Sequence, residues 1–118
     1  MKIYGLIGIA AKKGSIISGW SACTRELQKM RTGGTYICDD RTILILAGDS
    51  AANTKKEFSR LSFGKCIDCL VFGSCSELGR RIGKRERSVM IVNDKGLARG
   101  IRQLLCIEAD DNGGVKFG

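Results

Sequence analysis

An unbroken apolar run from Thr42 to Ala47 (Thr-Ile-Leu-Ile-Leu-Ala) constrains the fold of this chain more than any other segment. A strand with one face in water alternates apolar and polar residues, whereas this run does not, so we predict a strand that is covered on both faces. Shorter strand-like segments occur at 15–17, 66–72 and 88–92, and they alternate with segments of helical periodicity at 3–12, 19–31, 50–62, 74–83 and 94–105. This alternation predicts an α/β domain in which helices cover both faces of a small, largely parallel or mixed sheet.

Side chains suited to helix capping precede several of the expected helices. We expect Ser18, Ser50 and Asp94 to cap helices by accepting bonds from otherwise unpaired backbone N–H groups. Ser74 and Glu77 have the spacing of a capping box, in which each side chain accepts a bond from the backbone of the other. The helix that begins at residue 50 is expected to be buried through Ala51, Phe58 and Leu61.

Length and composition indicate one soluble unit. The chain has 118 residues, of which 43% are hydrophobic, enough for a core. We expect a single domain over residues 1–107 and a flexible, acidic and glycine-rich tail over 108–118. Residues 1–11 are apolar but short, and Lys12 and Lys13 stand where an export signal needs a small-residue cleavage site. We therefore expect a cytoplasmic protein without an export signal or a membrane span.

The chain is strongly basic and lacks the residues of common catalytic sites. Lys and Arg number 20 against 12 Asp and Glu, so the formal net charge is +8. Such an excess favours an anionic partner, nucleic acid before a membrane surface, although a basic surface without a partner is the alternative. There is no His, which removes the commonest general base, and there is no glycine-rich nucleotide-binding loop. We expect no enzymatic activity, no cofactor and no small-molecule substrate.

Cysteine is frequent, with six residues in the chain. Cys66 and Cys69 have the spacing of a zinc-ligand pair, but the sequence offers no second pair of this kind and no His to complete four ligands. We predict reduced, mostly buried thiols that act as small hydrophobic side chains. A thiol or zinc protein that uses Cys66 and Cys69 remains as a minor alternative. The cysteines are Cys23, Cys38, Cys66, Cys69, Cys75 and Cys106.

The segment from Lys12 to Gly33 combines a basic turn, a short strand and the expected helix 19–31. Two faces of this helix differ, because Ser21 and Arg25 lie one turn apart on a polar face. The other face is apolar and carries Trp20, Cys23, Leu27 and Met30. A helix start with free N–H groups, a glycine and nearby cations suits a phosphate-rich partner.

Several motifs resemble the L7Ae/L30e ribosomal protein family and, within it, the bacterial YlxQ-like members. The two most specific segments are Leu46–Lys56 (LAGDSAANTKK), which is similar to the family's "AEDASxNTKK", and Ser74–Lys84 (SCSELGRRIGK), which is similar to "SKEELGxAIGK". Weaker matches are Leu6–Gly14, Ile17–Gly19 and Ser88–Ile101, so that the resemblance extends over about residues 3–105.

The resemblance implies a three-layer α/β/α sandwich around a small mixed β-sheet. It also implies non-catalytic binding of kink-turn or related structured RNA, such as rRNA, in the ribosome or translation apparatus. This recognition rests on shape, phosphates and exposed base edges. We expect a monomer. The implied RNA-binding residues lie at the helix start and in the loop before the last strand: Gly19, Trp20, Ser21, Ala22 and Arg25; and Lys84, Arg85, Glu86 and Arg87. Because Lys12 and Lys13 flank the turn at Gly14, we also expect this basic turn to contact RNA, as part of one surface with the helix start and the loop.

The chain departs from the family pattern in two places. Kink-turn binders commonly carry Gly-x-Asn-Glu-x-x-Lys at the helix start, where this chain has Gly19, Ser21, Ala22 and Arg25. The amide and carboxylate that read base edges are therefore replaced, which leaves open a protein-interaction adaptor on the same fold that has lost kink-turn specificity. Trp20 is expected either to pack in the core or to stack on a base. The second departure is at residues 32–41, where the chain is longer than the family pattern.

Overall fold

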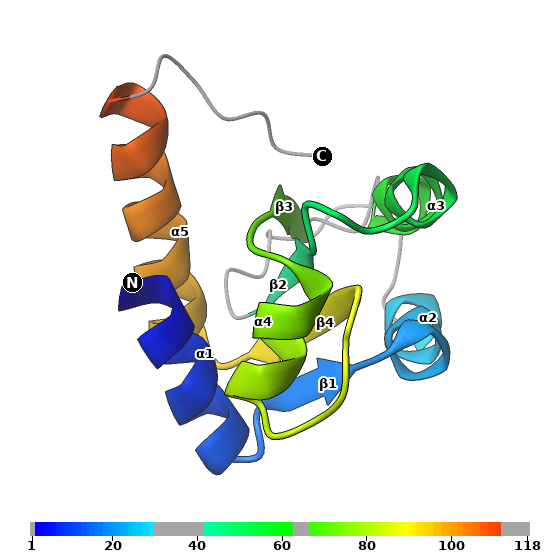
Figure 1. Cartoon of the computed structure of the whole chain (residues 1–118), viewed down its shortest axis with the longest axis horizontal. Helices are drawn as coiled ribbons and strands as arrows, with labels where there is room; N and C mark the ends of the chain where they lie inside the picture. The colour runs from blue at the N-terminus through cyan, green and yellow to red at the C-terminus, as the bar shows by residue number, and fades with distance from the viewer. Residues whose placement is uncertain (1, 30–41, 63–66, 112–118) are drawn as a thin grey trace.

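The computed structural model describes residues 2–29, 42–62 and 67–111, and the side chains among them as far as residue 105. The described elements follow one another in the expected alternation (Figure 1): α1 (Lys2–Lys12), β1 (Ile16–Ser18), α2 (Trp20–Lys29), β2 (Thr42–Leu46), α3 (Ala52–Ser62), β3 (Asp68–Val71), α4 (Cys75–Arg81), β4 (Val89–Asn93) and α5 (Lys95–Asp111). The predictions for Met30, for residues 32–41 and for the end of the tail lie outside the described residues.

The four strands form one mixed sheet in the order β1-β4-β2-β3. β4 is antiparallel to both β1 and β2, whereas β2 and β3 are parallel. β1, β2 and β3 therefore run in one direction. Their last residues lie on the side of the sheet where β4 begins, because Ser18 pairs with Met90, Leu46 pairs with Val89, and Val71 pairs with Leu46. We call this side of the sheet its carboxyl end, and the opposite side, where β4 finishes at Asn93, its amino end.

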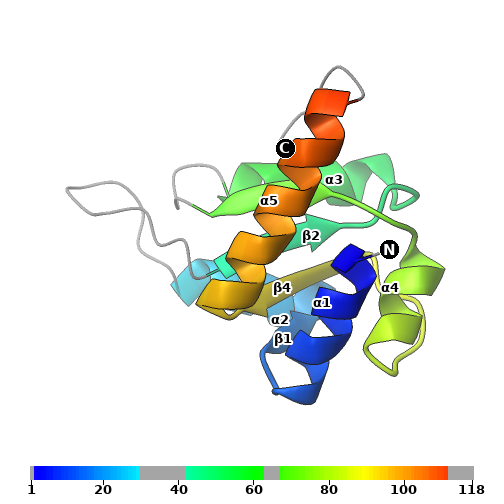
Figure 2. The ribbon, with the colours of Figure 1, turned by 90° about the vertical axis from the view of Figure 1, so that its left-hand side faces the viewer.

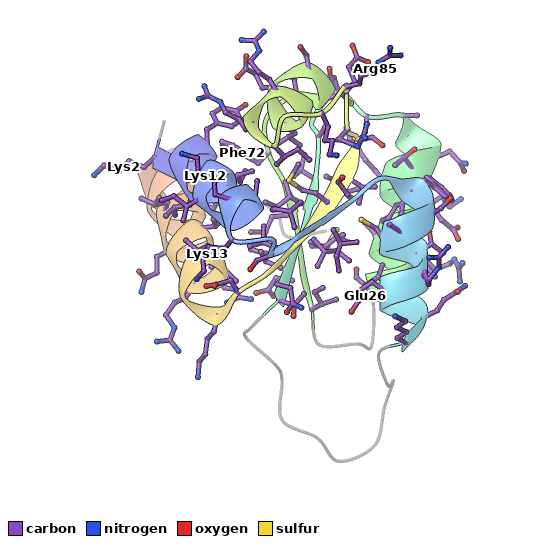
Figure 3. All side chains as sticks on the ribbon, turned by 90° about the horizontal axis from the view of Figure 1, so that it is seen from below. Lys2, Lys12, Lys13, Glu26, Phe72 and Arg85 are labelled. Carbon is purple, nitrogen blue, oxygen red and sulfur yellow. The ribbon has the colours of Figure 1, made fainter. Side chains whose placement is uncertain are left out.

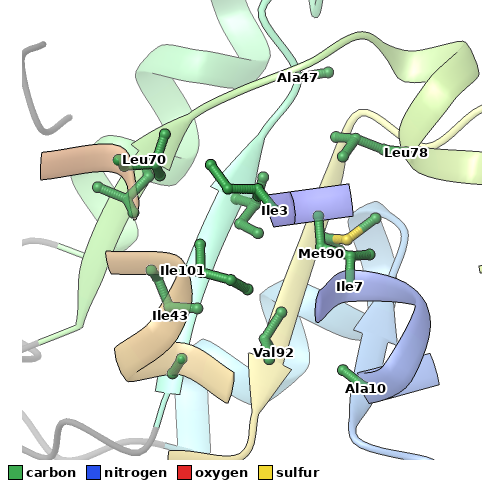
Figure 4. Packing of buried hydrophobic residues seen from close by; sticks show 13 residues of the cluster. Ile3, Ile7, Ala10, Ile43, Ala47, Leu70, Leu78, Met90, Val92 and Ile101 are labelled. Carbon is green, nitrogen blue, oxygen red and sulfur yellow. The ribbon is translucent and has the colours of Figure 1, made fainter. Parts of the chain in front are cut away.

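Two hydrophobic clusters lie on the two faces of the sheet. Successive residues of β2 point to opposite faces, so that Ile43 and Ile45 join one cluster and Leu44 and Leu46 the other. The first cluster packs under α1, α4 and α5 (Figure 4) and contains Ile3, Ile7, Ala10, Ile43, Ile45, Ala47, Leu70, Leu78, Met90, Val92, Ala98, Ile101 and Leu105. The second packs under α2 and α3 and contains Cys23, Leu27, Leu44, Leu46, Phe58, Ile67, Cys69, Val89 and Ile91.

This arrangement confirms the predicted α/β/α sandwich and the strand that is covered on both faces. All five residues of β2 are buried. Helices α1, α4 and α5 form one outer layer, and α2 and α3 form the other (Figures 1 and 2). None of the described helices combines the length and the apolar character that crossing a membrane requires.

Two of the predicted caps are confirmed and two are wrong. The Asp94 carboxylate accepts a bond from the Leu97 N–H (3.0 Å), and the Ser74 hydroxyl accepts one from the Glu77 N–H (3.2 Å). Glu77 itself forms ion pairs with Arg80 and Arg81, so the reciprocal half of a capping box is absent here. Ser18 is the last residue of β1, and Gly19 lies between it and the first residue of α2, so Ser18 does not occupy the cap position. Its hydroxyl accepts a bond from Arg87 instead.

The segment before α3 also differs from the prediction. The Ser50 hydroxyl donates to the Ala47 carbonyl (2.7 Å) and so closes a turn rather than capping the helix, which begins at Ala52. Ala51 is exposed, whereas Phe58 is fully buried and Leu61 is half-buried. The predicted burial of this helix is therefore correct for its later turns and wrong for Ala51.

Candidate functional site

The carboxyl end of the sheet brings together three segments that are distant in the sequence. β1, β2 and β3 are each followed by a helix, so α2, α3 and α4 all begin on this side. The loop from α4 to β4 also reaches it, because β4 starts there. In folds with parallel strands, the carboxyl ends of the strands are where ligands commonly bind.

Gly19 joins β1 to α2 in a conformation that suits glycine. Its φ is +94°, its N–H donates to the Val89 carbonyl (3.1 Å), and its carbonyl accepts from the Cys23 N–H (3.1 Å). Gly19 therefore occupies the position directly before the helix and is tied to the start of β4. The free N–H groups of the first turn of α2 give this side of the molecule a partial positive charge.

The end of α4 directs the chain into the loop from Lys84 to Arg87. Gly83 has a φ of +71°, its N–H donates to the Arg80 carbonyl (3.1 Å), and the Lys84 N–H donates to the Gly79 carbonyl (2.8 Å). These two bonds form a Schellman motif, which satisfies the last carbonyls of the helix. Gly79 is also covered by the loop, because a Cβ atom there would lie 1.9 Å from the carbonyl oxygen of Arg85.

Arg87 connects this loop to β1, the strand that precedes α2, through a hydrogen bond. Its Nε donates to the Ser18 hydroxyl (3.3 Å), its Nη1 donates to the Glu86 carbonyl (3.0 Å), and its backbone N–H donates to the Cys75 carbonyl (3.0 Å). The loop and the start of α2 are therefore held side by side by direct bonds, although 69 residues separate Arg87 from Ser18. We call Gly19–Arg25 together with Lys84–Arg87 the basic surface.

Three exposed cations of the basic surface have no carboxylate partner in the part of the chain that the structure describes. Arg25, Lys84 and Arg85 are exposed, and none of them forms an ion pair with a carboxylate of the described residues. Glu86, which is also exposed, is the one acidic residue of the loop. At the amino end, by contrast, Lys13 pairs with Asp94 (2.5 Å) and Arg102 pairs with Asp68. Arg25, Lys84 and Arg85 thus carry positive charge that no carboxylate of the described residues pairs with.

The turn between β2 and α3 contacts the first residue of α4, the helix that leads into the loop of the basic surface. The Asp49 carboxylate accepts a bond from the Cys75 N–H (2.8 Å), which lowers the pKa of Asp49. The Lys55 ammonium donates to the Gly48 carbonyl (2.7 Å). These residues belong to the Leu46–Lys56 motif, but only the three-dimensional arrangement shows that Asp49 holds the first turn of α4 and so, through α4, the loop that follows.

Trp20 is partly packed and partly exposed. The predicted apolar face of α2 is fully buried at Cys23 and Leu27, whereas 43% of Trp20 is exposed. Its ring meets that of Phe58 nearly at right angles, with the ring centroids 4.9 Å apart and the planes at 80°. Trp20 therefore packs against α3 and still offers part of its indole to solvent. Ser21 beside it is exposed and Ala22 is half-buried.

Lys12, Lys13 and Gly14 are not part of the basic surface. They precede β1 and so lie at the amino end, where the Asn93 N–H donates to the Ser15 carbonyl (2.8 Å). β4 separates them from the Lys84–Arg87 loop by about 16 Å at the rise of a strand. Figure 3 shows Lys12 and Lys13 beside α1 and α5, well away from Glu26 on α2. The expectation that this turn adjoins the helix start is wrong, because β1 leads the chain from one end of the sheet to the other.

The described cysteines have free thiols inside or near the core. Cys23 and Cys69 are buried and Cys75 is half-buried. Burial raises the pKa of the Cys23 thiol to about 12 and that of Cys75 to about 11, so both are protonated at neutral pH. Among residues 2–29, 42–62 and 67–105, no group of three or more metal-ligating side chains lies together. Cys66, the partner of Cys69 in the zinc alternative, lies outside the described residues.

Comparison with known proteins gives relatives over nearly the whole chain. No family model matches it. It is 28% identical to RNA-binding protein YlxQ of Bacillus subtilis over 106 residues (89% of this chain, 96% of that protein). It is 27% identical to RNA-binding protein YlxQ of Enterococcus faecium over 104 residues (88% and 91%). A solved structure of a protein with unknown function from Bacillus halodurans has a TM-score of 0.75 and 30% identity, covering 88% of this chain and 96% of that one. At this identity and coverage, the chain belongs to the same family as the Bacillus halodurans protein.

Proposed function

We propose that this protein binds structured RNA, without catalysis, through the basic surface at the carboxyl end of the sheet. The observation that carries the proposal is the bond from Arg87 to Ser18, which fixes a cationic loop beside the positive start of α2. The exposed cations Arg25, Lys84 and Arg85 lie on the same surface without carboxylate partners among the described residues. The similarity to two proteins named RNA-binding protein YlxQ supports RNA as the partner.

The chemistry of the surface suits an RNA backbone that bends sharply. Lys84, Arg85 and Arg25 supply charge for phosphates, and the N–H groups at the start of α2 supply hydrogen-bond donors for phosphate oxygens. Because the loop is already held by Arg87 and Gly79, binding costs little ordering of the protein. We therefore propose recognition by shape of an internal loop of the kink-turn type, within the translation apparatus of the cytoplasm.

Ser21 and Ala22 limit how well the basic surface can discriminate between RNA sequences. A hydroxyl and a methyl group at these positions cannot make the base-edge contacts of an amide and a carboxylate, so discrimination between sequences is weaker than affinity for phosphates. This substitution is also the observation that favours the second candidate, a protein-interaction adaptor on the same fold. The two candidates differ in whether purified protein binds RNA at physiological salt.

The test is the affinity of the full chain for a kink-turn RNA and for a fully paired duplex of similar length, across a series of salt concentrations. We expect tighter binding to the kink-turn RNA and a linear fall of log K with log salt, of roughly 0.7–0.9 per phosphate contact. The double variant Lys84→Ala/Arg85→Ala should lower this slope by about 1.4–1.8. The matched control, Lys12→Ala/Lys95→Ala, removes two exposed cations at the amino end and should leave the slope unchanged.

Two results would contradict the proposal. Absence of RNA binding at physiological salt would favour the adaptor. An equal loss of affinity in both double variants would show that net charge, and not the basic surface, attracts the RNA.

A further inference from the structure

We propose that the indole of Trp20 is a stacking platform for one unpaired nucleobase of the bound RNA. This inference rests on the proposed RNA binding and adds a contact that phosphate recognition does not require. Base–aromatic stacking tolerates any base, since every base has a π-face, and it suits a surface whose base-edge contacts are reduced at Ser21 and Ala22.

The exposure of Trp20 is unusual for this molecule. Among the described residues, the large hydrophobic side chains that are exposed are Trp20 (43%) and Ile9 (49%). Ile9 lies on α1, in the helix layer on the other face of the sheet, so the two do not form a contiguous apolar patch. A docking surface for a protein needs such a patch, whereas a nucleobase needs one aromatic plane. The isolation of Trp20 therefore favours a base over a protein partner.

The indole also packs against a buried neighbour. Phe58, against which it packs at 80°, is fully buried in the cluster under α2 and α3. Cys23 and Leu27 anchor the same helix face, and Gly19 is bonded to Val89 directly before Trp20. A perpendicular contact leaves at least one broad face of the indole without a stacked ring. Because the contact with Phe58 already restricts the side chain, stacking on it costs less conformational entropy than stacking on a fully exposed indole.

The charges around Trp20 suit a nucleotide rather than a free aromatic group. Trp20 is the first residue of α2, where free N–H groups attract an anion. Arg25, which has no ion pair with a carboxylate of the described residues, lies on the same helix. On the other side, Gly19 connects Trp20 to the start of β4, which the loop bearing Arg87 precedes. A base stacked on the indole would therefore have its own phosphate close to positive charge.

The experiment uses Trp20 as its own reporter, since it is the one Trp of the chain. The full chain is titrated with a kink-turn RNA that carries one unpaired adenosine in its loop and with the same RNA lacking it, while tryptophan fluorescence and affinity are measured. We expect quenching and tighter binding with the unpaired base. Trp20→Leu, which keeps apolar bulk over Phe58 but has no π-face, should weaken binding about tenfold or more, and Trp20→Phe should retain most of the affinity.

The outcomes separate this inference from the proposed function. Trp20→Leu should keep the wild-type salt slope, because no phosphate contact is lost. Binding of both RNAs with a normal salt slope, but with neither quenching nor a difference between Trp20→Leu and wild type, would overturn the stacking role and leave the RNA-binding proposal intact. If neither RNA binds, the proposed function itself fails. Urea unfolding of each variant shows whether loss of the Phe58 contact, and not of stacking, explains a change.

Discussion

At the scale of single residues, Gly79 supports the basic surface without belonging to it. It lies in α4, and the carbonyl group of Arg85 packs where its side chain would be. We expect Gly79→Ala to displace the Lys84–Arg87 loop and to lower the free energy of unfolding by about 1–3 kcal/mol, the usual cost of overpacking. Urea unfolding measures the change in the free energy of unfolding, and the affinity for RNA shows whether the Lys84–Arg87 loop has been displaced.

The chain contains a matched control for this substitution. Gly5 lies on the exposed side of α1, and a Cβ atom there would meet no heavy atom within 4 Å. Gly5→Ala should therefore stabilise the protein by about 0.5–1 kcal/mol, because alanine loses less backbone entropy in a helix. Equal effects of the two substitutions would show that the loop does not press on Gly79 in solution.

Ser21 and Ala22 give a second prediction at this scale, which concerns specificity. Ser21→Asn/Ala22→Glu restores an amide and a carboxylate at the positions that the family pattern assigns to base-edge reading. If the start of α2 faces the RNA, the double variant should prefer a kink-turn RNA over a variant whose G·A pairs are replaced by Watson–Crick pairs, by about 1–3 kcal/mol for each good contact. The ratio of the two dissociation constants measures this preference. No change in the ratio would argue against the alignment at this helix.

At the scale of elements, the bond between Arg87 and Ser18 decides whether the loop and α2 act as one surface. Ser18→Ala removes the acceptor of the Arg87 Nε bond but leaves the core contacts of β1 intact. We expect weaker RNA binding with little change in the free energy of unfolding, because the bond is partly exposed. Arg87→Lys should have a similar effect, since a lysine cannot hold both Ser18 and the Glu86 carbonyl in the same geometry.

Hydrogen exchange offers an independent measurement of the same link. Backbone amides from Lys84 to Glu86 should exchange faster in Ser18→Ala than in wild type, whereas those of β2 should not change. Unchanged exchange in the loop would show that Gly79 and the Schellman motif alone hold it.

The helices and strands can be predicted from the sequence, whereas the contacts between elements distant in the sequence cannot. Local periodicity predicted the alternation of helices and strands, and the apolar run at Thr42–Ala47 predicted a strand with both faces covered, because these patterns record burial directly. The antiparallel pairing of β1 with β4 has no local signature. For that reason Lys12–Gly14, adjacent to the helix in sequence, was placed with it, and the Ser18–Arg87 contact was missed.

At the scale of the whole molecule, two ion pairs join separate elements at the amino end of the sheet. The pairs Lys13–Asp94 and Arg102–Asp68 connect elements at the amino end. The contact with Lys13 lowers the pKa of Asp94 below its ordinary value of 3.8. A carboxylate whose pKa is lower in the folded state contributes stability above its unfolded pKa, and this contribution is lost as the pH falls through the folded value.

Unfolding at acid pH tests the ion pair between Lys13 and Asp94. Asp94→Asn keeps an acceptor for the Leu97 N–H but loses the charge that pairs with Lys13. We expect the wild type to lose more stability than Asp94→Asn between about pH 7 and pH 3, so that the two curves approach each other in acid. Urea midpoints at several pH values measure the difference. Parallel curves would show that the ion pair is absent in solution.

The separation of the two ends has a consequence for how such proteins diverge. The contacts that join α1 and α5 to the sheet lie away from Arg25, Lys84 and Arg85, and these three cations have no ion pair within the described part of the fold. Substitution of these three cations would therefore alter the proposed RNA binding without removing an ion pair between described residues. If the basic surface binds RNA as proposed, such substitutions can change the RNA target while the contacts that join α1 and α5 to the sheet are preserved.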